Sequence, residues 1–222
     1  TESISWVANS YILGLTLIVP LSGWLASRFG TRQTIVASML IFSIAALGCA
    51  RADSFTTLVA WRFIQGAGGG LLIPVGQALT FNLFQGRQRA AISTLIMCVA
   101  LMAPALSPLL GGMLVDVLSW RWIFYSNIPF SLLAALLAAI WIRPQAMKRT
   151  RADITGIILV CGTLGTLLRS LSLFSEQHAV PQAAFWLGVS LLLGWGYLRH
   201  YRHQPTAILD LSLLRNPQLN LS

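Results

Sequence analysis

Residues 55–84 read FTTLVAWRFIQGAGGGLLIPVGQALTFNLF, a run of 30 residues with no acidic side chain and a single basic one, Arg62. A helix of about 20 apolar residues crosses the hydrocarbon core of a bilayer, so this run is long enough to do so. Six other apolar runs are similar and are separated by short polar breaks: 6–26, 33–50, 90–115, 121–142, 154–174 and 183–198. The sequence therefore predicts an all-α integral membrane protein with seven transmembrane helices.

The composition of the chain supports a membrane location. Of its 222 residues, 56% are hydrophobic and 9% are charged, whereas soluble domains carry about 25% charged residues. This balance excludes a soluble enzyme, a disordered tail and a disulfide-rich secreted domain. Cys49, Cys98 and Cys161 lie inside apolar runs without the spacing of a metal site, and no catalytic Ser/His/Asp or Cys/His set stands out. We therefore expect no metal, no cofactor and no enzymatic activity.

The net charge of +9 would suggest a nucleic-acid partner in a soluble protein, but its distribution indicates a membrane protein instead. The even-numbered connections between predicted helices hold only Arg51 and Arg121. The odd-numbered connections hold eleven basic residues: Arg28, Arg32, Arg87, Arg89, Arg143, Lys148, Arg149, Arg151, Arg199, Arg202 and Arg215. By the positive-inside rule the odd connections are cytoplasmic. We expect a multi-pass protein of the bacterial inner membrane, with residues 1–5 outside and one further span upstream.

Arg62 lies inside a predicted span, about 10 Å from its start by helical rise, and Gln65 lies nearly a turn deeper. An arginine at this depth is costly unless it meets water or a polar partner. Arg62 with Gln65 is therefore the first candidate for a functional site. The alternative is a structural arginine whose side chain reaches the membrane surface.

Glycine and proline patterns predict two helix surfaces with special packing. Gly66 and Gly70 lie four residues apart on one helix face, where they allow another backbone to approach closely. Pro74 follows them and should bend the helix. The second surface is a stripe that should slide against a neighbouring helix, with an ordinary kinked interface as the alternative. It consists of Pro104, Ser107, Pro108, Gly111 and Gly112.

Five short motifs follow one another along the chain. They are GWLASRFGTR at 23–32, LVAWRFIQG at 58–66, PALSPLLGG at 104–112, SWRWIF at 119–124 and ILDLSLLR at 208–215. In series they resemble the major facilitator superfamily, and most of all its branch of drug:proton antiporters with fourteen spans. The resemblance covers nearly the whole chain. It implies a partial helical bundle of this family, which lacks the first span and the C-terminal half.

The resemblance also implies roles for residues of these motifs. Arg62, with Gln65, would take part in proton coupling, and the stripe within 104–112 would be the hinge of the antiporter helix. The outer loop would hold Asp116, Trp120 and Arg121. The cytoplasmic gate loop would hold Gly23, Ser27, Arg28, Gly30 and Arg32. Ser27 stands where the family has an acid, so the gate loses a charge but keeps a hydrogen-bonding group.

The resemblance divides the chain into three parts. Residues 1–142 would form the N-terminal transporter bundle, with family spans two to six. Residues 143–203 would be a cytoplasmic linker followed by two extra central spans. Residues 204–222 would lead into the C-terminal bundle.

We therefore expect a secondary active transporter that exports lipophilic, cationic drugs by alternating access, with the proton gradient as energy source. The alternatives are a specific metabolite exporter or uniporter, and a non-transporting membrane scaffold or receptor. The expected partners are a small-molecule substrate and the lipid bilayer, with no nucleic acid; nothing identifies accessory envelope proteins. All six acidic residues lie at span ends or in connections, so we expect the coupling acid outside this chain. Candidates to line a substrate cavity are Tyr11, Gln77 and Asn82.

Overall fold

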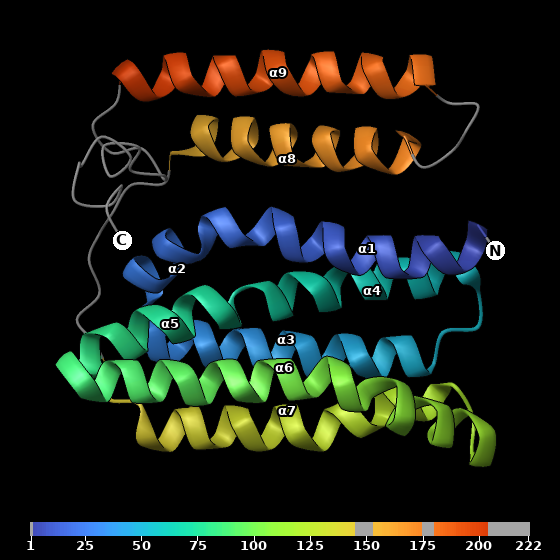
Figure 1. Ribbon diagram of the computed structural model, residues 1–222, viewed down its shortest axis with the longest axis vertical. Helices are drawn as coiled ribbons and strands as arrows, with labels where there is room; N and C mark the ends of the chain where they lie inside the picture. The colour runs from blue at the N-terminus through green and yellow to red at the C-terminus, as the bar shows by residue number, and fades with distance from the viewer. Residues whose placement is uncertain (1, 145–152, 175–179, 204–222) are drawn as a thin grey trace. The chain divides into compact units, whose positions relative to one another are not determined.

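The computed structural model describes residues 2–144, 153–174 and 180–203. Within these ranges the regular secondary structure is helical, with no strand (Figure 1). This confirms the all-α prediction. In chain order the helices are α1 (Glu2–Ile18), the short 3-10 helix η1 (Val19–Leu21), α2 (Ser22–Phe29), α3 (Thr31–Ala50), α4 (Phe55–Gly70), α5 (Leu72–Leu83), α6 (Gly86–Val117), α7 (Arg121–Trp141), α8 (Ile154–Phe174) and α9 (Val180–His203).

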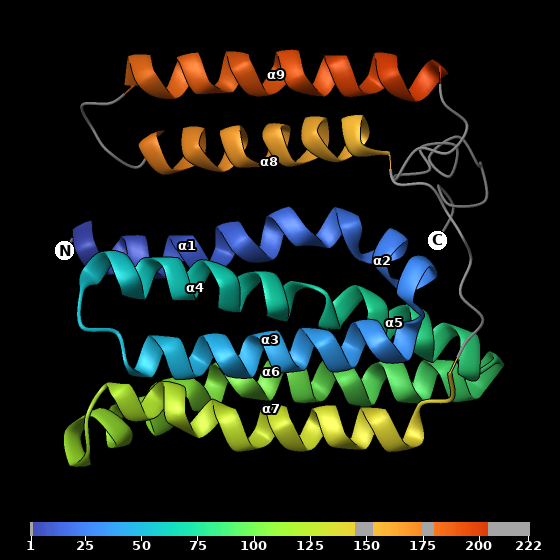
Figure 2. The same cartoon turned by 180° about the vertical axis from the view of Figure 1, so that it is seen from behind.

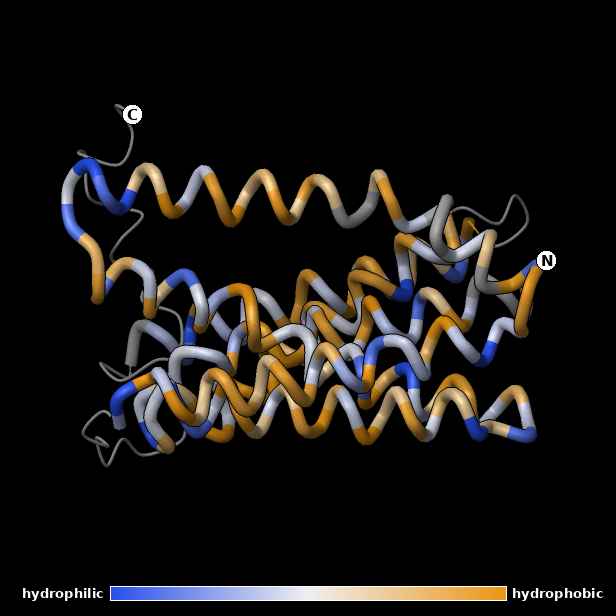
Figure 3. Tube along the Cα trace, turned by 90° about the horizontal axis from the view of Figure 1, so that it is seen from below, coloured by the Kyte–Doolittle hydropathy of each residue, from blue (hydrophilic) through white to orange (hydrophobic). Residues whose placement is uncertain are grey.

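Six helical stretches in the described part of the chain are long and apolar enough to cross a bilayer. Each corresponds to a predicted span, and Figure 3 shows hydrophobic colours running along the helices. The stretches are Trp6–Phe29, Thr31–Ala50, Phe55–Leu83, Gly86–Val117, Arg121–Trp141 and Ile154–Phe174.

The seventh predicted span, residues 183–198, forms a helix but differs from the other six. These residues lie in α9, a helix of 24 residues that is not among the six stretches of sufficient length and hydropathy. Its leucines are interrupted by Gly188, Gly194 and Gly196, and its last turns carry basic side chains, which lowers the mean hydropathy. The described residues therefore support six spans by this criterion, and a seventh helix of lower hydropathy.

The chain divides into two compact units, Thr1–Arg149 and Thr150–Ser222. In the first unit, α4 packs between α1 and α3, and α3 packs in turn against α7 (Figures 1 and 2). Helix α6 makes its main contacts with α5 and α7. None of the residues in its most apolar stretch is buried. The core of this unit therefore lies among α1, α3, α4 and α7.

Small side chains on α3 explain its place inside the first unit. Ser38, Ala45, Ala46 and Cys49 are fully buried there. Small residues let neighbouring helices approach closely, which is how helices associate when lipid removes the hydrophobic driving force between them. Helix α3 can therefore pack against both α4 and α7 along its length.

Two breaks between helices of the first unit consist of a single residue each. Gly30 separates α2 from α3 with a φ of 86°, a backbone conformation that favours glycine. The polar loop predicted before α3 is thereby corrected to this single residue, because Ser27 and Arg28 lie within α2. The second break, at Leu71, separates α4 from α5. Pro74 lies in the first turn of α5, where its missing N–H removes no intrahelical hydrogen bond.

In the second unit, α8 and α9 form an antiparallel pair that is held by polar contacts along its length. The Ser170 hydroxyl donates to the Ala183 carbonyl at 2.8 Å, and the Ser190 hydroxyl donates to the Thr163 carbonyl at 3.0 Å. Such hydrogen bonds between helices add modestly to their association in a membrane, about 0.6 kcal/mol on average. The predicted span 154–174 is thus paired with α9.

Candidate functional site

The guanidinium of Arg62 in α4 is surrounded by groups from three helices. Its Nε donates to the Val7 carbonyl of α1 at 3.4 Å, and its Nη1 donates to Oε1 of Gln65 at 3.1 Å. The ring centroids of Tyr11 from α1 and Phe124 from α7 lie 4.9 and 5.4 Å from its Cζ. Aromatic faces attract a cation, and more strongly where water is excluded. Arg62 therefore has polar and aromatic partners inside the bundle.

Gln65 links Arg62 to the interior of the protein. Its side chain is 1% exposed. Its Oε1 accepts the hydrogen bond from Arg62 and lies 3.8 Å from Sγ of the fully buried Cys49 on α3. The two residues predicted as one site from their spacing are thus in direct contact, and α3 contributes a third group. We call Tyr11, Cys49, Arg62, Gln65 and Phe124 the Arg62 cluster.

Among the described residues, part of the hydrogen-bonding capacity of Arg62 is unused. Within the ranges that the structure describes, Nη2 of Arg62 has no hydrogen-bond acceptor, and no carboxylate forms an ion pair with it. In the sequence, no acidic residue occurs between Asp53 and Asp116. The cluster therefore holds a positive charge in a partly desolvated position that can still accept an anionic partner.

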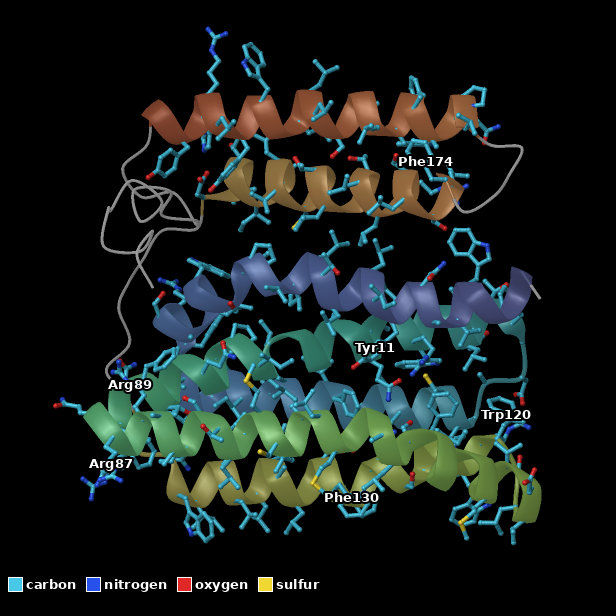
Figure 4. The ribbon with its side chains drawn as sticks, viewed as in Figure 1. Tyr11, Arg87, Arg89, Trp120, Phe130 and Phe174 are labelled. Atoms are coloured by element: carbon cyan, nitrogen blue, oxygen red, sulfur yellow. The ribbon has the colours of Figure 1, made fainter. Side chains whose placement is uncertain are left out.

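Glycines allow α1 to lie against α4 beside this cluster. A Cβ at Gly66 would collide with the Tyr11 carbonyl, and a Cβ at Gly70 would lie 2.7 Å from the Leu15 carbonyl. On α1, a Cβ at Gly14 would collide with the Phe63 carbonyl of α4. The face predicted for close packing is therefore the face that α1 covers. Tyr11 projects from α1 toward α4 (Figure 4).

The predicted gate residues lie together at the junction of α2 and α3. The Ser27 hydroxyl donates to the Trp24 carbonyl of its own helix at 2.9 Å. Gly23 and Arg28 are exposed, and a Cβ at Gly23 would meet no atom of the described residues within 4 Å. Arg32 lines a groove between α3 and α7. The structure therefore separates these residues from the Arg62 cluster.

The predicted hinge stripe lies in α6, which is helical through Pro104 and Pro108. Ser107 is exposed on this helix. In the described part of the chain, nothing lies within 4 Å of a Cβ placed at Gly111 or Gly112. The close approach seen at the glycines of α4 is therefore not repeated at these two glycines of α6.

The remaining predicted residues lie in two places. Asp116 is in the last turn of α6, and the guanidinium of Arg121 lies 4.6 Å from the Trp120 ring and donates to the Ala52 carbonyl at 3.2 Å. This contact joins α7 to the connection between α3 and α4. The three residues proposed to line a cavity are not brought together: Tyr11 belongs to the Arg62 cluster, whereas Gln77 and Asn82 are exposed on α5.

Sequence reasoning missed the groups that reach the Arg62 cluster from other helices. Val7, Cys49 and Phe124 come from α1, α3 and α7, and no local pattern indicates that they meet. It also missed a contact in the second unit, where His200 Nε2 lies 2.8 Å from Oδ1 of the buried Asp153. These two residues are 47 positions apart. The acid of this pair lies at the start of α8, and not inside a span.

These features define a multi-pass helical membrane protein with a charged side chain held inside its helix bundle. The profile of the Major Facilitator Superfamily matches residues 1–214. The chain therefore belongs to this superfamily of membrane transporters, as the five motifs predicted. The Major Facilitator Superfamily is a family of transporters and not of enzymes.

Three bacterial relatives are similar over almost the whole chain, and each is named "Putative multidrug resistance protein MdtD". The relative from Enterobacter sp. (strain 638) is 33% identical over 95% of this chain and 45% of its own length. The relative from Klebsiella pneumoniae (strain 342) is 32% identical over 96% of this chain and 45% of its own length. The relative from Pectobacterium carotovorum is 33% identical over 93% of this chain and 45% of its own length.

The chain spans about half the length of the curated relatives that it matches. Its relatives are bacterial, and its helices are apolar over the length of a membrane span. The chain is therefore a multi-pass protein of a bacterial inner membrane.

Proposed function

We propose that the protein is a secondary active transporter that exports lipophilic, cationic drugs in exchange for protons by alternating access. The Arg62 cluster is the observation that carries this proposal. It holds a cation inside the bundle with one guanidinium nitrogen uncommitted among the described residues. Relatives named for multidrug resistance support the class of substrate.

Arg62 would act on the proton through electrostatics. A cation close to a carboxylate stabilises its ionised form, so a carboxylate that approaches Arg62 releases its proton, and one that moves away takes a proton up. An acid that alternates between these positions couples proton flow to the change of access. All six acids of this chain lie at helix ends or in connections, so this acid would come from another part of the protein.

The test uses the intact protein in everted membrane vesicles with an acidic interior. Lipophilic cations are added one at a time, and the pH gradient is followed by fluorescence quenching. We expect a fall of the gradient that depends on the added compound. With Arg62→Ala the response should fall by about tenfold or more. The variant lacks the positive charge that stabilises the ionised carboxylate, and this step occurs in every transport cycle.

Two further variants separate coupling from folding. Arg62→Lys keeps the charge but loses the forked geometry that contacts Val7 and Gln65, so we expect partial activity. Arg51→Ala removes an exposed arginine at the end of α3 and should leave the response unchanged. If Arg62→Ala, folded and present at wild-type amount, transports as the wild type does, Arg62 has no role in coupling. If no compound moves protons, the protein is a specific exporter, a uniporter or a non-transporting scaffold.

A further inference from the structure

A groove of about 450 Å³ lies between α3 and α7 in the first unit. It is formed by the start of α3 and the end of α7, together with Pro144. These two ends belong to the first and fifth connections, which the charge distribution assigns to the cytoplasmic side. The groove therefore joins two basic segments that are more than a hundred residues apart in the sequence.

One end of the groove is polar and positive. Arg32 and Gln33 line it, and neither the first turn of α3 nor its N-cap residue Gly30 carries an acidic side chain. In the described part of the chain, Arg32 forms no ion pair. The positive end of the α3 dipole adds to the attraction for an anion there. This end of the groove suits a phosphate group at the level of the lipid headgroups.

The other part of the groove is apolar. Val36, Ala37 and Leu40 follow Arg32 along one face of α3, and Ala139 of α7 lies opposite. The charged end and this stripe lie on consecutive turns, so they extend over about 12 Å by helical rise. A free phosphate ion would use only the polar end. A phospholipid with a phosphate at Arg32 and an acyl chain along the stripe would use both.

We propose that this groove binds an anionic phospholipid of the cytoplasmic leaflet. Its phosphate lies at Arg32 and Gln33, and one acyl chain lies along Val36 and Leu40 against Ala139. Charge complementarity selects the lipid class, because Arg32 lines the groove and Arg143 directly precedes its lining residue Pro144 in the chain. This inference does not depend on the proposed transport reaction.

The test measures lipid binding to the intact protein in detergent by native mass spectrometry. The probes are phosphatidylglycerol, zwitterionic phosphatidylcholine and inorganic phosphate. We expect phosphatidylglycerol to bind more tightly than phosphatidylcholine, and inorganic phosphate not to displace it. Arg32→Gln should weaken the binding of phosphatidylglycerol about fivefold, the effect of one basic residue near a membrane surface. Arg28→Gln removes the same charge from the same junction but outside the groove, and should change binding by less than about twofold.

A second pair of variants tests the apolar part. Ala37→Phe fills the groove at an exposed position and leaves every charge in place, so it should weaken binding at least as much as Arg32→Gln. Ala91→Phe places the same side chain at an exposed position of α6 and should have no effect. The proposal is overturned if both lipids bind equally, if Arg28→Gln weakens binding as much as Arg32→Gln, or if Ala37→Phe has no effect. Displacement by inorganic phosphate would instead identify an anion site.

Discussion

At Gly66 a single hydrogen atom in place of a side chain determines how closely α1 approaches α4. The Tyr11 carbonyl occupies the space that a Cβ would need, and Gly14 has the same role on the facing helix. Because Tyr11 and Val7 are carried on α1, this approach also places the ring and the carbonyl that contact Arg62. Close helix packing and the Arg62 cluster therefore depend on the same glycines.

Gly66→Ala should destabilise the intact protein by about 1–3 kcal/mol, the usual cost of an added methyl group in a tightly packed interface. The atoms in its way belong to the backbone of α1, so the helices must separate. Gly76→Ala in α5 is the matched control, because no atom of the described residues lies within 4 Å of the added Cβ. The melting temperature in detergent should fall for the first variant only. Equal melting temperatures would mean that α1 and α4 do not pack closely.

At the scale of single helices, the start of α8 shows how one side chain serves two purposes. The Asp153 carboxylate accepts a hydrogen bond from the Gly156 N–H at 2.9 Å, which caps the helix, and it also contacts His200 of α9. A Cβ at Gly156 would collide with the carboxylate as it lies, so a side chain there would require the carboxylate to turn. One acid thereby satisfies one of the unpaired N–H groups at the start of α8 and ties this end of the helix to α9.

Asp153→Ala should weaken the first turn of α8 by about 1 kcal/mol, the typical loss for a helix cap. The measurement is hydrogen exchange of the peptide that contains Gly156, which should exchange about fivefold faster. His200→Ala removes the contact with α9 but keeps the cap, so protection of Gly156 should change little. Asp116→Ala removes an exposed acid from the last turn of α6 and should leave α8 as it is. Unchanged exchange in Asp153→Ala would show that the cap does not stabilise this helix.

At the scale of the whole molecule, the distribution of basic residues predicts the orientation in the membrane. Arg87 and Arg89 lie in the first turn of α6, close to its connection with α5 (Figure 4). Arg89 donates to the Phe81 and Phe84 carbonyls at the end of α5, at 2.6 and 3.3 Å. Its positive charge therefore also complements the negative end of that helix dipole. The connection between α3 and α4 has one arginine and one acid, so it has no such bias.

The orientation can be checked with single cysteines in a background that carries Cys49→Ala, Cys98→Ala and Cys161→Ala. Gln88→Cys lies in the first turn of α6 and Asp53→Cys in the connection between α3 and α4, and both positions are exposed. A membrane-impermeant maleimide added to intact cells should label Asp53→Cys and not Gln88→Cys, because the basic connection stays inside. Everted vesicles should give the opposite pattern. The same labelling pattern for both positions, or the reverse of the expected one, would contradict the predicted orientation.

The sequence by itself determined the membrane class, six apolar spans and the superfamily. These properties depend on residues that are consecutive or regularly spaced, and an apolar run of about 20 residues has few alternatives to a membrane helix. For the same reason the spacing of Arg62 and Gln65, and of Gly66 and Gly70, indicated which residues share a helix face. The positions at which helices end were harder to predict from the sequence. The polar residues before α3 suggested a loop, but only Gly30 leaves the helical conformation there.

Only the tertiary structure decided which groups meet across helices. Val7 reaches Arg62 from 55 residues away, Phe124 reaches it from α7, and Asp153 meets His200 across the α8–α9 pair. The groove at Arg32 likewise needs α7 beside α3. The physical reason is that apolar helices in a bilayer associate through the fit of their surfaces, and many pairings satisfy the same hydropathy. Local patterns indicate that a helix forms and which face is special, but its neighbours depend on the shapes of all the helices together.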